Sequence, residues 1–363
     1  MPLDEALAAW LKLSLTPGLG GDELRRLLLA FRDPSRILAA TRRELARHVP
    51  EPVAAALKEN AADAAVARAT EWLQQPSHHA LTLADERYPR RLLEIPDPPP
   101  LLYVKGRAEL LARPSLAIVG SRHATAQGVA NAEAFARALA QAGLTIVSGL
   151  ALGIDAAAHR GGLAAPSSSI AVLGTGMDLV YPARNRALAH ELAARGALVT
   201  EFALGTRPLA GNFPRRNRLI SGLALGCLVV EAAADSGSLI TARLALEQGR
   251  EVFAIPGSIH SPLSKGCHAL IKQGAKLVES AQDILEELRL PAAPAAALAP
   301  EAPESDSSVQ RLLAALGHDP CDLDALVARS GLAAAELAAL LTRLEIEGRV
   351  EALPGGRYQR LRR

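Results

Sequence analysis

The sequence predicts an α/β protein: a doubly wound, Rossmann-like central domain flanked by an N-terminal helical domain and a C-terminal winged helix. Short apolar or β-branched runs alternate with helical stretches over residues 79–290, which is typical of a parallel sheet buried on both faces. Helical periodicity dominates residues 1–78, and three helical stripes followed by a hairpin pattern occupy residues 306–363. Residues 291–305, rich in proline and alanine, are predicted to be a linker.

The composition is that of a globular protein and limits the kind of ligand site. Hydrophobic residues make up 49% of the 363 residues and charged residues 21%. No apolar run reaches the roughly 20 residues that span a membrane, and the first residues lack a secretory signal, so we expect a cytoplasmic protein without membrane contact. The net charge of +2 excludes a uniformly cationic surface, and any anion site must therefore be local.

The cysteines give no sign of a disulfide or a metal. The three cysteines are odd in number and far apart in sequence, which favours reduced thiols. The spacing of His260, Cys267 and His268 matches no zinc pattern, and a fourth ligand is missing. We therefore expect neither a metal nor a cofactor.

A glycine-rich turn stands out in the N-terminal region. Leu24, Leu27, Leu28 and Phe31 follow helical spacing and predict a helix there. Residues 15–22, just before it, resemble the hairpin of a helix-hairpin-helix or SAM-like domain, in which glycine amides at a helix start can face a phosphate. A tight turn between two packed helices explains the same residues equally well.

The predicted strands should present their loops at one edge of the sheet. The strands are residues 116–119, 144–147, 170–173, 197–200, 227–230 and 252–255. Right-handed crossovers place the loops after such strands on the edge where doubly wound folds bind ligands. Four of these loops contain small, turn-forming residues whose amides could bind an anion: Gly120, Ser121 and Arg122; Gly149; Gly174, Thr175 and Gly176; Ser236, Gly237 and Ser238.

The most informative segment is residues 212–222. Pro214 suits the first turn of a helix, so the cationic side chains that follow should lie near a helix start, where anions are favoured. These side chains are Arg215, Arg216 and Arg218, together with the amide of Asn217. Pairing with Glu201 or Glu231 could give one arginine a structural role, but we do not expect it to absorb all three.

The usual nucleotide and hydrolase motifs are missing. Neither Gly174 nor Gly120 continues into Gly-x-Gly-x-x-Gly, and the sequence contains no Walker A or Gly-x-Ser-x-Gly segment. Asp155 and His159, four residues apart, are expected to be a helix-start cap and an exposed imidazole rather than an acid/base pair.

Taken in order, the motifs resemble those of the DprA/Smf family (DNA-processing protein A). They are Val119-Gly-Ser-Arg, Ser148-Gly-Leu-Ala-Leu-Gly-Ile-Asp, Ala171-Val-Leu-Gly-Thr-Gly-Met-Asp, Tyr181-Pro with Asn185, Phe213-Pro-Arg-Arg-Asn-Arg with Ile220-Ser-Gly, Val230-Glu-Ala, Ser236-Gly-Ser-Leu-Ile-Thr-Ala and Ile255-Pro-Gly. The helical N-terminal domain and the winged helix also resemble the family's architecture.

The resemblance implies a non-catalytic homodimer that binds and protects single-stranded DNA and loads RecA recombinase onto it during natural transformation. Carried over by motif, it places Asn185 and Phe213 in the binding pocket with Arg122, Arg216, Asn217, Arg218 and the glycine loops. Ala183 stands where many relatives have a lysine, so we expect Arg184 to make that contact. Lys265 completes the predicted DNA-binding set.

The sequence also limits the mechanism. Aromatic residues are only 3% of the chain, so stacking on Phe213 or Tyr181 should be a minor part of binding.

The dimer and RecA surfaces are expected near residues 240–275, although Leu270 and Ile271 could equally be core. The third helix of the winged helix has a poor charge balance for DNA reading, and its basic tail could be solvated, so we expect an accessory role: the helix carries Arg343 against Glu336, Glu345 and Glu347, and the tail Arg357, Arg360, Arg362 and Arg363.

Two other functions fit the fold class. Rossmann-like phosphoribohydrolases use the same edge of the sheet, but residues 235–241 lack the glutamate of their Pro-Gly-Gly-x-Gly-Thr-x-x-Glu motif. A transcription regulator that reads DNA through the winged helix would instead bind a duplex with tight sequence specificity.

Overall fold

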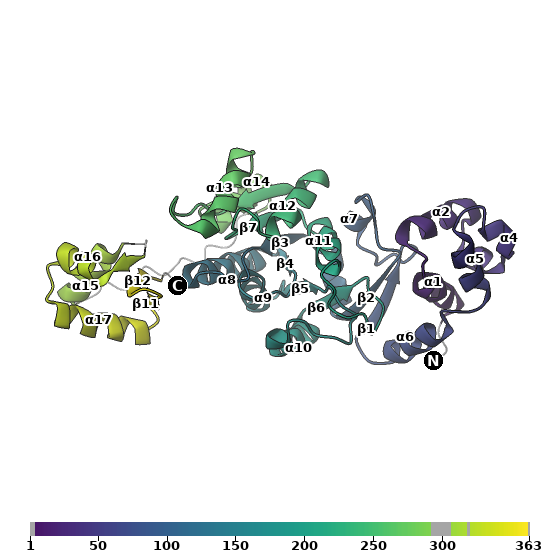
Figure 1. Cartoon of the computed structure of the whole chain (residues 1–363), viewed down its shortest axis with the longest axis horizontal. Helices are drawn as coiled ribbons and strands as arrows, with labels where there is room; N and C mark the ends of the chain where they lie inside the picture. Colours follow the sequence, from purple (N-terminus) through teal and green to yellow (C-terminus); the bar gives the residue numbers. More distant parts are fainter. Residues whose placement is uncertain (1–3, 292–305, 318–319, 362–363) are drawn as a thin grey trace.

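The computed structural model describes residues 4–291, 306–317 and 320–361. Figure 1 shows the chain passing from N-terminal helices through a central sheet to a small C-terminal unit. The predicted linker lies outside the described residues, apart from Pro291, and so do Arg362 and Arg363 of the basic tail. The doubly wound central domain and the winged helix are confirmed.

Six helices form the N-terminal region. They are α1 (Glu5–Leu15), α2 (Gly21–Phe31), α3 (Pro34–Ala39), α4 (Arg42–Leu45), α5 (Glu51–Lys58) and α6 (Asp63–Leu73). The predicted stripe buries Leu24 and Leu27 in a core formed by α1 to α5. Helices α1 and α6 also pack on the central sheet, where Trp10 and Trp72 share a core cluster with Tyr103.

Nine strands form the central sheet. They are β1 (His78–Thr82), β2 (Leu101–Gly106), β3 (Ser115–Val119), β4 (Thr145–Ser148), β5 (Ser169–Val172), β6 (Ala197–Thr200), β7 (Gly226–Val229), β8 (Glu251–Ala254) and β9 (Lys276–Leu277). Strands β3 to β8 are the six that the sequence predicts, and each boundary lies within one residue of the prediction. The sequence missed β1 and β2, which extend the sheet by antiparallel pairing to β6, and the two-residue edge strand β9.

The order of the strands determines where a ligand can bind. The order is β1-β2-β6-β5-β4-β3-β7-β8-β9, so the chain runs outward from β3 to β6 and then returns to place β7 on the other side of β3. The loops after β3 and β7 therefore diverge and leave a crevice at the carboxyl ends of these two strands. This switch point is where open α/β sheets bind their ligands.

Helices cover both faces of the sheet. One core cluster holds α7 (Arg90–Leu93), α11 (Asn212–Leu223), α12 (Ser238–Glu247) and α13 (Lys265–Lys272). A second cluster holds α8 (Ala126–Gln141), α9 (Ile154–Leu163) and α14 (Ala281–Glu287), and α10 (Arg186–Arg195) joins the cluster of α1 and α6. Three 3₁₀ turns complete this part: η1 (Ala108–Ala112), η2 (Ala183–Asn185) and η3 (Pro262–Ser264).

The C-terminal unit is a winged helix around its own leucine-rich core. Its elements are α15 (Ser307–Leu316), β10 (Cys321–Asp322), α16 (Leu323–Ser330), α17 (Ala334–Ile346), β11 (Val350–Leu353) and β12 (Arg357–Arg360). Within the described ranges no single helix is long and apolar enough to cross a membrane; α16 and α17 pass that test only together, as a pair bent by 110°.

Candidate nucleic-acid interface

A cleft of about 430 Å³ opens at the switch point between β3 and β7, beside the start of α11. We call it the α11 cleft. Half of the predicted binding residues line it: Gly120, Ser121, Arg122, Phe213, Arg216, Asn217, Ser236, Gly237 and Ser238. Other lining residues were not predicted, among them His123, Ile220, Ile240 and Thr241. The cleft therefore gathers residues from three separate motifs at one edge of the sheet.

Helical periodicity decides which side chains of α11 reach the cleft. Phe213, Arg216, Asn217 and Ile220 follow the i, i+3, i+4, i+7 spacing of one helix face, and all four line it. Two guanidinium groups lie near the Phe213 ring, with Arg122 5.9 Å and Arg216 6.0 Å from its centroid. These distances are within the range of cation–π attraction.

A smaller hollow of about 100 Å³ adjoins the cleft and adds a second aromatic ring. Tyr181 lines this hollow with Phe213, and the two ring centroids are 5.5 Å apart. The side chain of Tyr181 is exposed. The site thus presents one pair of aromatic surfaces next to two cations, a combination that suits an unstacked base and its phosphate.

Arg216 is a fixed cation in the wall of the cleft. The residue is only 4% exposed, and its Nη1 donates a 2.6 Å hydrogen bond to the carbonyl oxygen of Val172. Burial lowers the pKa of Arg216 to about 10, while the nearby carboxylate of Asp155 acts in the opposite direction. Arg216 therefore remains positively charged at neutral pH.

Asp155 and His159 lie behind Arg216, and the structure corrects both predictions made for them. Asp155 does not cap α9; its carboxylate accepts the amides of Gly149 (3.0 Å) and Ala151 (3.3 Å) in the preceding loop. His159 is fully buried rather than exposed, because its ring fits between the amide of Leu150 and the hydroxyl of Ser169.

The charge states of these two groups follow from their burial. Burial lowers the pKa of His159 to about 3, and the charge of Arg216 adds to that shift, so the imidazole is neutral. Burial raises the pKa of Asp155, and Arg216 opposes the change. The wall of the cleft thus contains one fixed cation, Arg216, with the hydrogen-bonded carboxyl group of Asp155 behind it.

Two predicted glycines leave room for side chains of the site. A Cβ on Gly149 would lie 2.0 Å from Nη1 of Arg216, and a Cβ on Gly174 would lie 2.8 Å from the ring of Phe213. Only glycine lets these two side chains pack so closely on the loops. The glycines therefore position the site residues.

The prediction of a rim lined by free amides is wrong at three positions. The amide of Ser121 donates to the carbonyl oxygen of Glu231 (2.7 Å), that of Gly149 to Asp155, and that of Gly176 to the carbonyl oxygen of Thr206 (2.9 Å). These donors satisfy the fold itself. These three amides are therefore not available to an anion.

Several other predicted residues lie outside both hollows. Thr175 is buried and donates to the carbonyl oxygen of Leu179. Asn185 is buried and donates to the carbonyl oxygens of Leu150 and Ala151, which braces the loop after β4. Arg184 is exposed on η2, and Lys265 is exposed at the start of α13.

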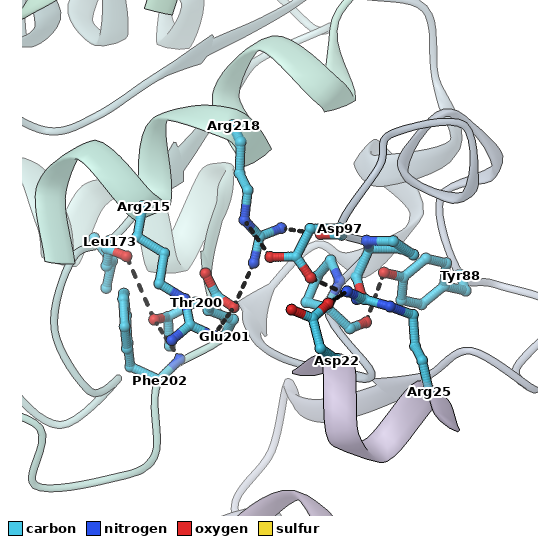
Figure 2. A network of polar contacts seen from close by, with 12 residues as sticks. Asp22, Arg25, Tyr88, Asp97, Leu173, Thr200, Glu201, Phe202, Arg215 and Arg218 are labelled. Carbon is cyan, nitrogen blue, oxygen red and sulfur yellow. Dashed lines mark hydrogen bonds and ion pairs between the residues drawn. The ribbon is translucent and has the colours of Figure 1, made fainter. Parts of the chain in front are cut away.

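Arg215 and Arg218 lie on the other side of α11, which corrects the expectation for the arginine segment. Both pair with Oε2 of Glu201, at 3.0 Å and 2.6 Å, and Arg218 also pairs with Asp97 (Figure 2). The side chains of Arg218 and Glu201 are 11% and 4% exposed. Structural pairing thus absorbs two of the three arginines, because a spacing of three residues puts them on one helix face.

Glu231, the other acid considered for these arginines, has a different partner. Its carboxylate accepts the amide (2.9 Å) and the hydroxyl (2.6 Å) of Thr125, the residue before α8. Burial raises the pKa of Glu231, and both hydrogen bonds oppose that change. No sequence signal indicated Asp97, which lies 121 residues before Arg218.

Comparison with known proteins identifies the family. The sequence profile of the family described as DNA recombination-mediator protein A matches residues 79–289, which is more than half of the chain. The chain belongs to the DprA/Smf family. The profile of the DprA winged helix domain matches residues 293–356.

Relatives and solved structures extend this result. Protein Smf of Escherichia coli is 48% identical over 299 residues, which are 80% of each chain, and DNA processing protein DprA of Streptococcus pneumoniae is 48% identical over 208 residues, 57% of this chain and 73% of that one. The X-ray structure of pneumococcal DprA matches with a TM-score of 0.69 at 38% identity, covering 79% of this chain and 99% of that chain. A DprA structure from Helicobacter pylori, described for its single-stranded DNA binding mode, matches with a TM-score of 0.53 at 30% identity, covering 58% of this chain and 95% of that one.

Proposed function

We propose that this chain binds single-stranded DNA in the α11 cleft and does so without catalysing a reaction. The observation that carries the proposal is the placement of Phe213 beside both Arg122 and Arg216 at the β3/β7 switch point. Guanidinium groups bind phosphate oxygens, and the aromatic face accepts a base that is free to leave its stack. A base in a duplex is paired and stacked and cannot lie on this ring, so the site should bind single-stranded DNA in preference to duplex DNA.

The mode of binding follows from the small number of aromatic side chains. Phe213 and Tyr181 offer stacking surface for one or two bases, so contacts with the DNA backbone supply most of the affinity and sequence preference is slight. The hydroxyls of Ser236 and Ser238, 2.7 Å apart, and the amide of Asn217 add neutral donors around the two cations.

Membership of the DprA/Smf family supports the wider role. The Helicobacter pylori relative is described as binding single-stranded DNA. By resemblance, the chain protects incoming DNA, acts as a homodimer and loads RecA recombinase during transformation. Leu270 is core, with 6% exposure, so we assign the dimer and RecA surfaces to exposed apolar residues of the same region that lie outside the cleft: Leu246 and Ile259.

The arrangement of acids argues against a hydrolase. Among the described residues that line the α11 cleft, Asp155 is the only carboxylate, and two amides already bind it behind Arg216. His159 is buried and uses both ring nitrogens. Neither group is placed to move a proton to or from a ligand in the cleft.

The ion pairs of the winged helix favour an accessory role for this domain in DNA binding. Arg343 of α17 pairs with Glu347 (2.9 Å) and Asp306 (3.6 Å), so the helix that would enter a major groove has its cation neutralised. A regulator that reads duplex DNA would need cations free to contact phosphate there. We therefore assign DNA binding to the α11 cleft.

Fluorescence anisotropy with single- and double-stranded oligonucleotides tests the proposal. We expect the chain to prefer the single strand, and Arg122→Ala to weaken that binding about tenfold, as expected for the loss of a charged hydrogen bond. Arg68→Ala, an identical change at an exposed position of α6, is the control and should have no effect. Equal binding of the duplex, or release of the base from nucleoside monophosphates by the pure protein, would contradict the proposal.

A further inference from the structure

The position of Arg122 depends on the loop that carries it. Its side chain is exposed and, within the described part of the chain, makes no hydrogen bond or ion pair; its guanidinium lies 5.9 Å from the centroid of the Phe213 ring. Arg216 differs, because its hydrogen bond to the carbonyl oxygen of Val172 fixes it inside the fold. Whether Arg122 faces the α11 cleft is therefore decided by the backbone of the loop between β3 and α8.

The backbone of Glu231 holds one end of this loop. Strands β3 and β7 pair in parallel through their last residues, and Glu231 lies two residues beyond β7. Its carbonyl oxygen accepts the amide of Ser121 at 2.7 Å, which continues the pairing past the strands. The amide of Ile154, at the start of α9, adds a hydrogen bond to the carbonyl oxygen of Ser121 (3.2 Å). The loop therefore leaves the sheet from a fixed point directly before Arg122.

The side chain of the same Glu231 holds the other end of the loop. Its Oε2 accepts the amide of Thr125 (2.9 Å), and its Oε1 accepts the hydroxyl (2.6 Å). Thr125 is the N-cap of α8, and its hydroxyl accepts the amide of Gly128 (2.9 Å). A Cβ on Gly128 would lie 2.4 Å from Cδ of Glu231, so glycine at this position lets the first turn of α8 pack directly on the carboxylate. Glu231 thus anchors the start of α8 as well as the end of β3.

The segment between the two anchored residues is short and carries residues of the cleft. It consists of Arg122, His123 and Ala124, and the first two line the α11 cleft. Glu231 is not among the described residues that line the cleft, so it acts on a ligand only through the loop. Because the segment has so little length to spare, a shift of either anchored end moves the backbone of Arg122.

A carboxylate suits this double contact. The hydroxyl of Thr125 already accepts the amide of Gly128, and it donates its own proton to Glu231. The carboxylate has two acceptor oxygens, one for the hydroxyl and one for the amide of Thr125. A glutamine side chain has one acceptor oxygen and an NH2 donor, so it cannot accept both groups on separate oxygens. Glu231→Gln therefore weakens the anchor with almost no change in side-chain size.

We propose that Glu231 is a positioning residue of the DNA site, which anchors residues 121–125 from both ends so that Arg122 faces the α11 cleft. The effect on DNA binding rests on the proposed function, whereas the anchoring of the loop does not. Glu231 makes no contact with the ligand itself, so its substitution should weaken DNA binding only while Arg122 is present.

A double-mutant cycle, measured by fluorescence anisotropy with a single-stranded oligonucleotide, tests the proposal. Glu231→Gln should weaken binding by the full chain about fivefold, the order expected for one lost hydrogen bond. In the Arg122→Ala background the same change should weaken binding less than about twofold, because two residues that act through one contact are not additive. Thr125→Val should reproduce the loss seen in Glu231→Gln, and Thr125→Ser, which keeps the hydroxyl, should bind like the wild type.

Glu201→Gln is the matched control. Glu201 is another carboxylate that follows a strand at the same edge of the sheet, but it pairs with Arg215 and Arg218 on the other side of α11. Its substitution should lower the free energy of unfolding and leave the oligonucleotide affinity within about threefold of wild type. A loss of affinity that came only from general destabilisation would appear in both glutamine variants.

Amide hydrogen exchange of the chain without DNA measures the anchor directly. Peptides that cover residues 121–128 should exchange about threefold faster in Glu231→Gln than in the wild type, and they should be unchanged in Glu201→Gln. Faster exchange in both variants would contradict a specific anchor.

The outcomes separate this proposal from the proposed function. Equal losses of affinity from Glu231→Gln in the two backgrounds, or wild-type affinity and exchange in the folded variant, would overturn it. If the wild type does not bind the oligonucleotide, or if Arg122→Ala binds it as well as the wild type, the proposed function fails. Hydrogen exchange then decides whether Glu231 anchors the loop: faster exchange in Glu231→Gln supports the anchor, and unchanged exchange refutes it as well.

Discussion

Both sides of α11 carry arginine side chains, but the arginines of the two sides have different partners and different roles. On the cleft side, Arg216 has a single buried carboxylate nearby, and the exposed Arg122 lies beside the Phe213 ring. On the domain side, Arg215 and Arg218 share Glu201, and Arg218 also pairs with Asp97. The difference shows that an arginine in a motif cannot be counted as a phosphate contact until its acidic partners are known.

The domain side continues into the N-terminal helices. Asp97 accepts a hydrogen bond from Arg25 of α2, and Arg25 also pairs with Asp22 (Figure 2). Charges of opposite sign therefore alternate from α2 to α11. This chain of ion pairs holds the helix in place, while the cleft side remains available to a ligand.

The largest expected effect is a loss of folding stability when an arginine on the domain side of α11 is removed. Arg218→Ala should lower the free energy of unfolding by about 3 kcal/mol, because it leaves the buried Glu201 with one partner fewer. The oligonucleotide affinity of the folded variant should stay within about threefold of wild type. Urea denaturation and anisotropy measure the two quantities. A stable variant that has lost DNA binding would place Arg218 on the DNA path and break the comparison.

The second effect is a loss of folding stability at acid pH, caused by the buried His159 on the cleft side. The pKa of His159 is lowered to about 3 in the fold, so between that value and the ordinary pKa of about 6.5 only the unfolded chain takes up the proton. The free energy of unfolding therefore decreases as the pH falls, by about 2 kcal/mol between pH 7 and pH 5.

Urea denaturation of His159→Gln over this pH range checks the assignment. The variant should show a flatter pH dependence than wild type. His190→Gln, the same change at an exposed position of α10, should keep the wild-type slope. Equal slopes for all three proteins would contradict the buried, neutral state of His159.

The third effect is on the salt dependence of DNA binding. If Arg122 and Arg216 each neutralise one phosphate, log K should fall against log salt with a slope of about −1.4. Arg122→Ala should remove about 0.7 from the magnitude of that slope and change the free energy of unfolding by less than about 0.5 kcal/mol. Affinity measured between low and moderate salt checks this, and a flat response in the wild type would be inconsistent with a phosphate site.

The smallest effect concerns the winged helix. A chain that ends at residue 290 keeps the α11 cleft intact, so its affinity for single-stranded oligonucleotides should stay within about threefold of the full chain. Anisotropy compares the two proteins. A much larger loss would mean that the winged helix, and not the cleft side of α11, supplies most of the binding.

The fold was largely predictable because buried parallel strands leave a strong sequence signal. Six continuous apolar runs located β3 to β8 within one residue. Strand β9 has two residues, and β1 and β2 belong to an antiparallel extension that does not follow the alternation of strands and helices. The short edge and extension strands were therefore missed.

The site was predictable only on its cleft side. There the glycine loops and the helix start are local features of the sequence, and they locate Arg122, Phe213 and Arg216. The domain side depends on contacts between distant residues, since Arg218 meets Glu201 across 17 residues and Asp97 across 121. Burial of His159 likewise depends on the packing of α9, which residue types alone do not reveal.

Photochemical crosslinking of an oligonucleotide that carries 5-iodouracil, followed by mass spectrometry, tests the DNA site most directly. Aromatic side chains are the preferred crosslinking partners, so we expect crosslinks to Phe213 and Tyr181. At protein concentrations below the Kd, both crosslinks should fall about tenfold in Arg122→Ala. Crosslinks confined to residues 306–363, or a pattern that Arg122→Ala does not change, would contradict binding in the α11 cleft.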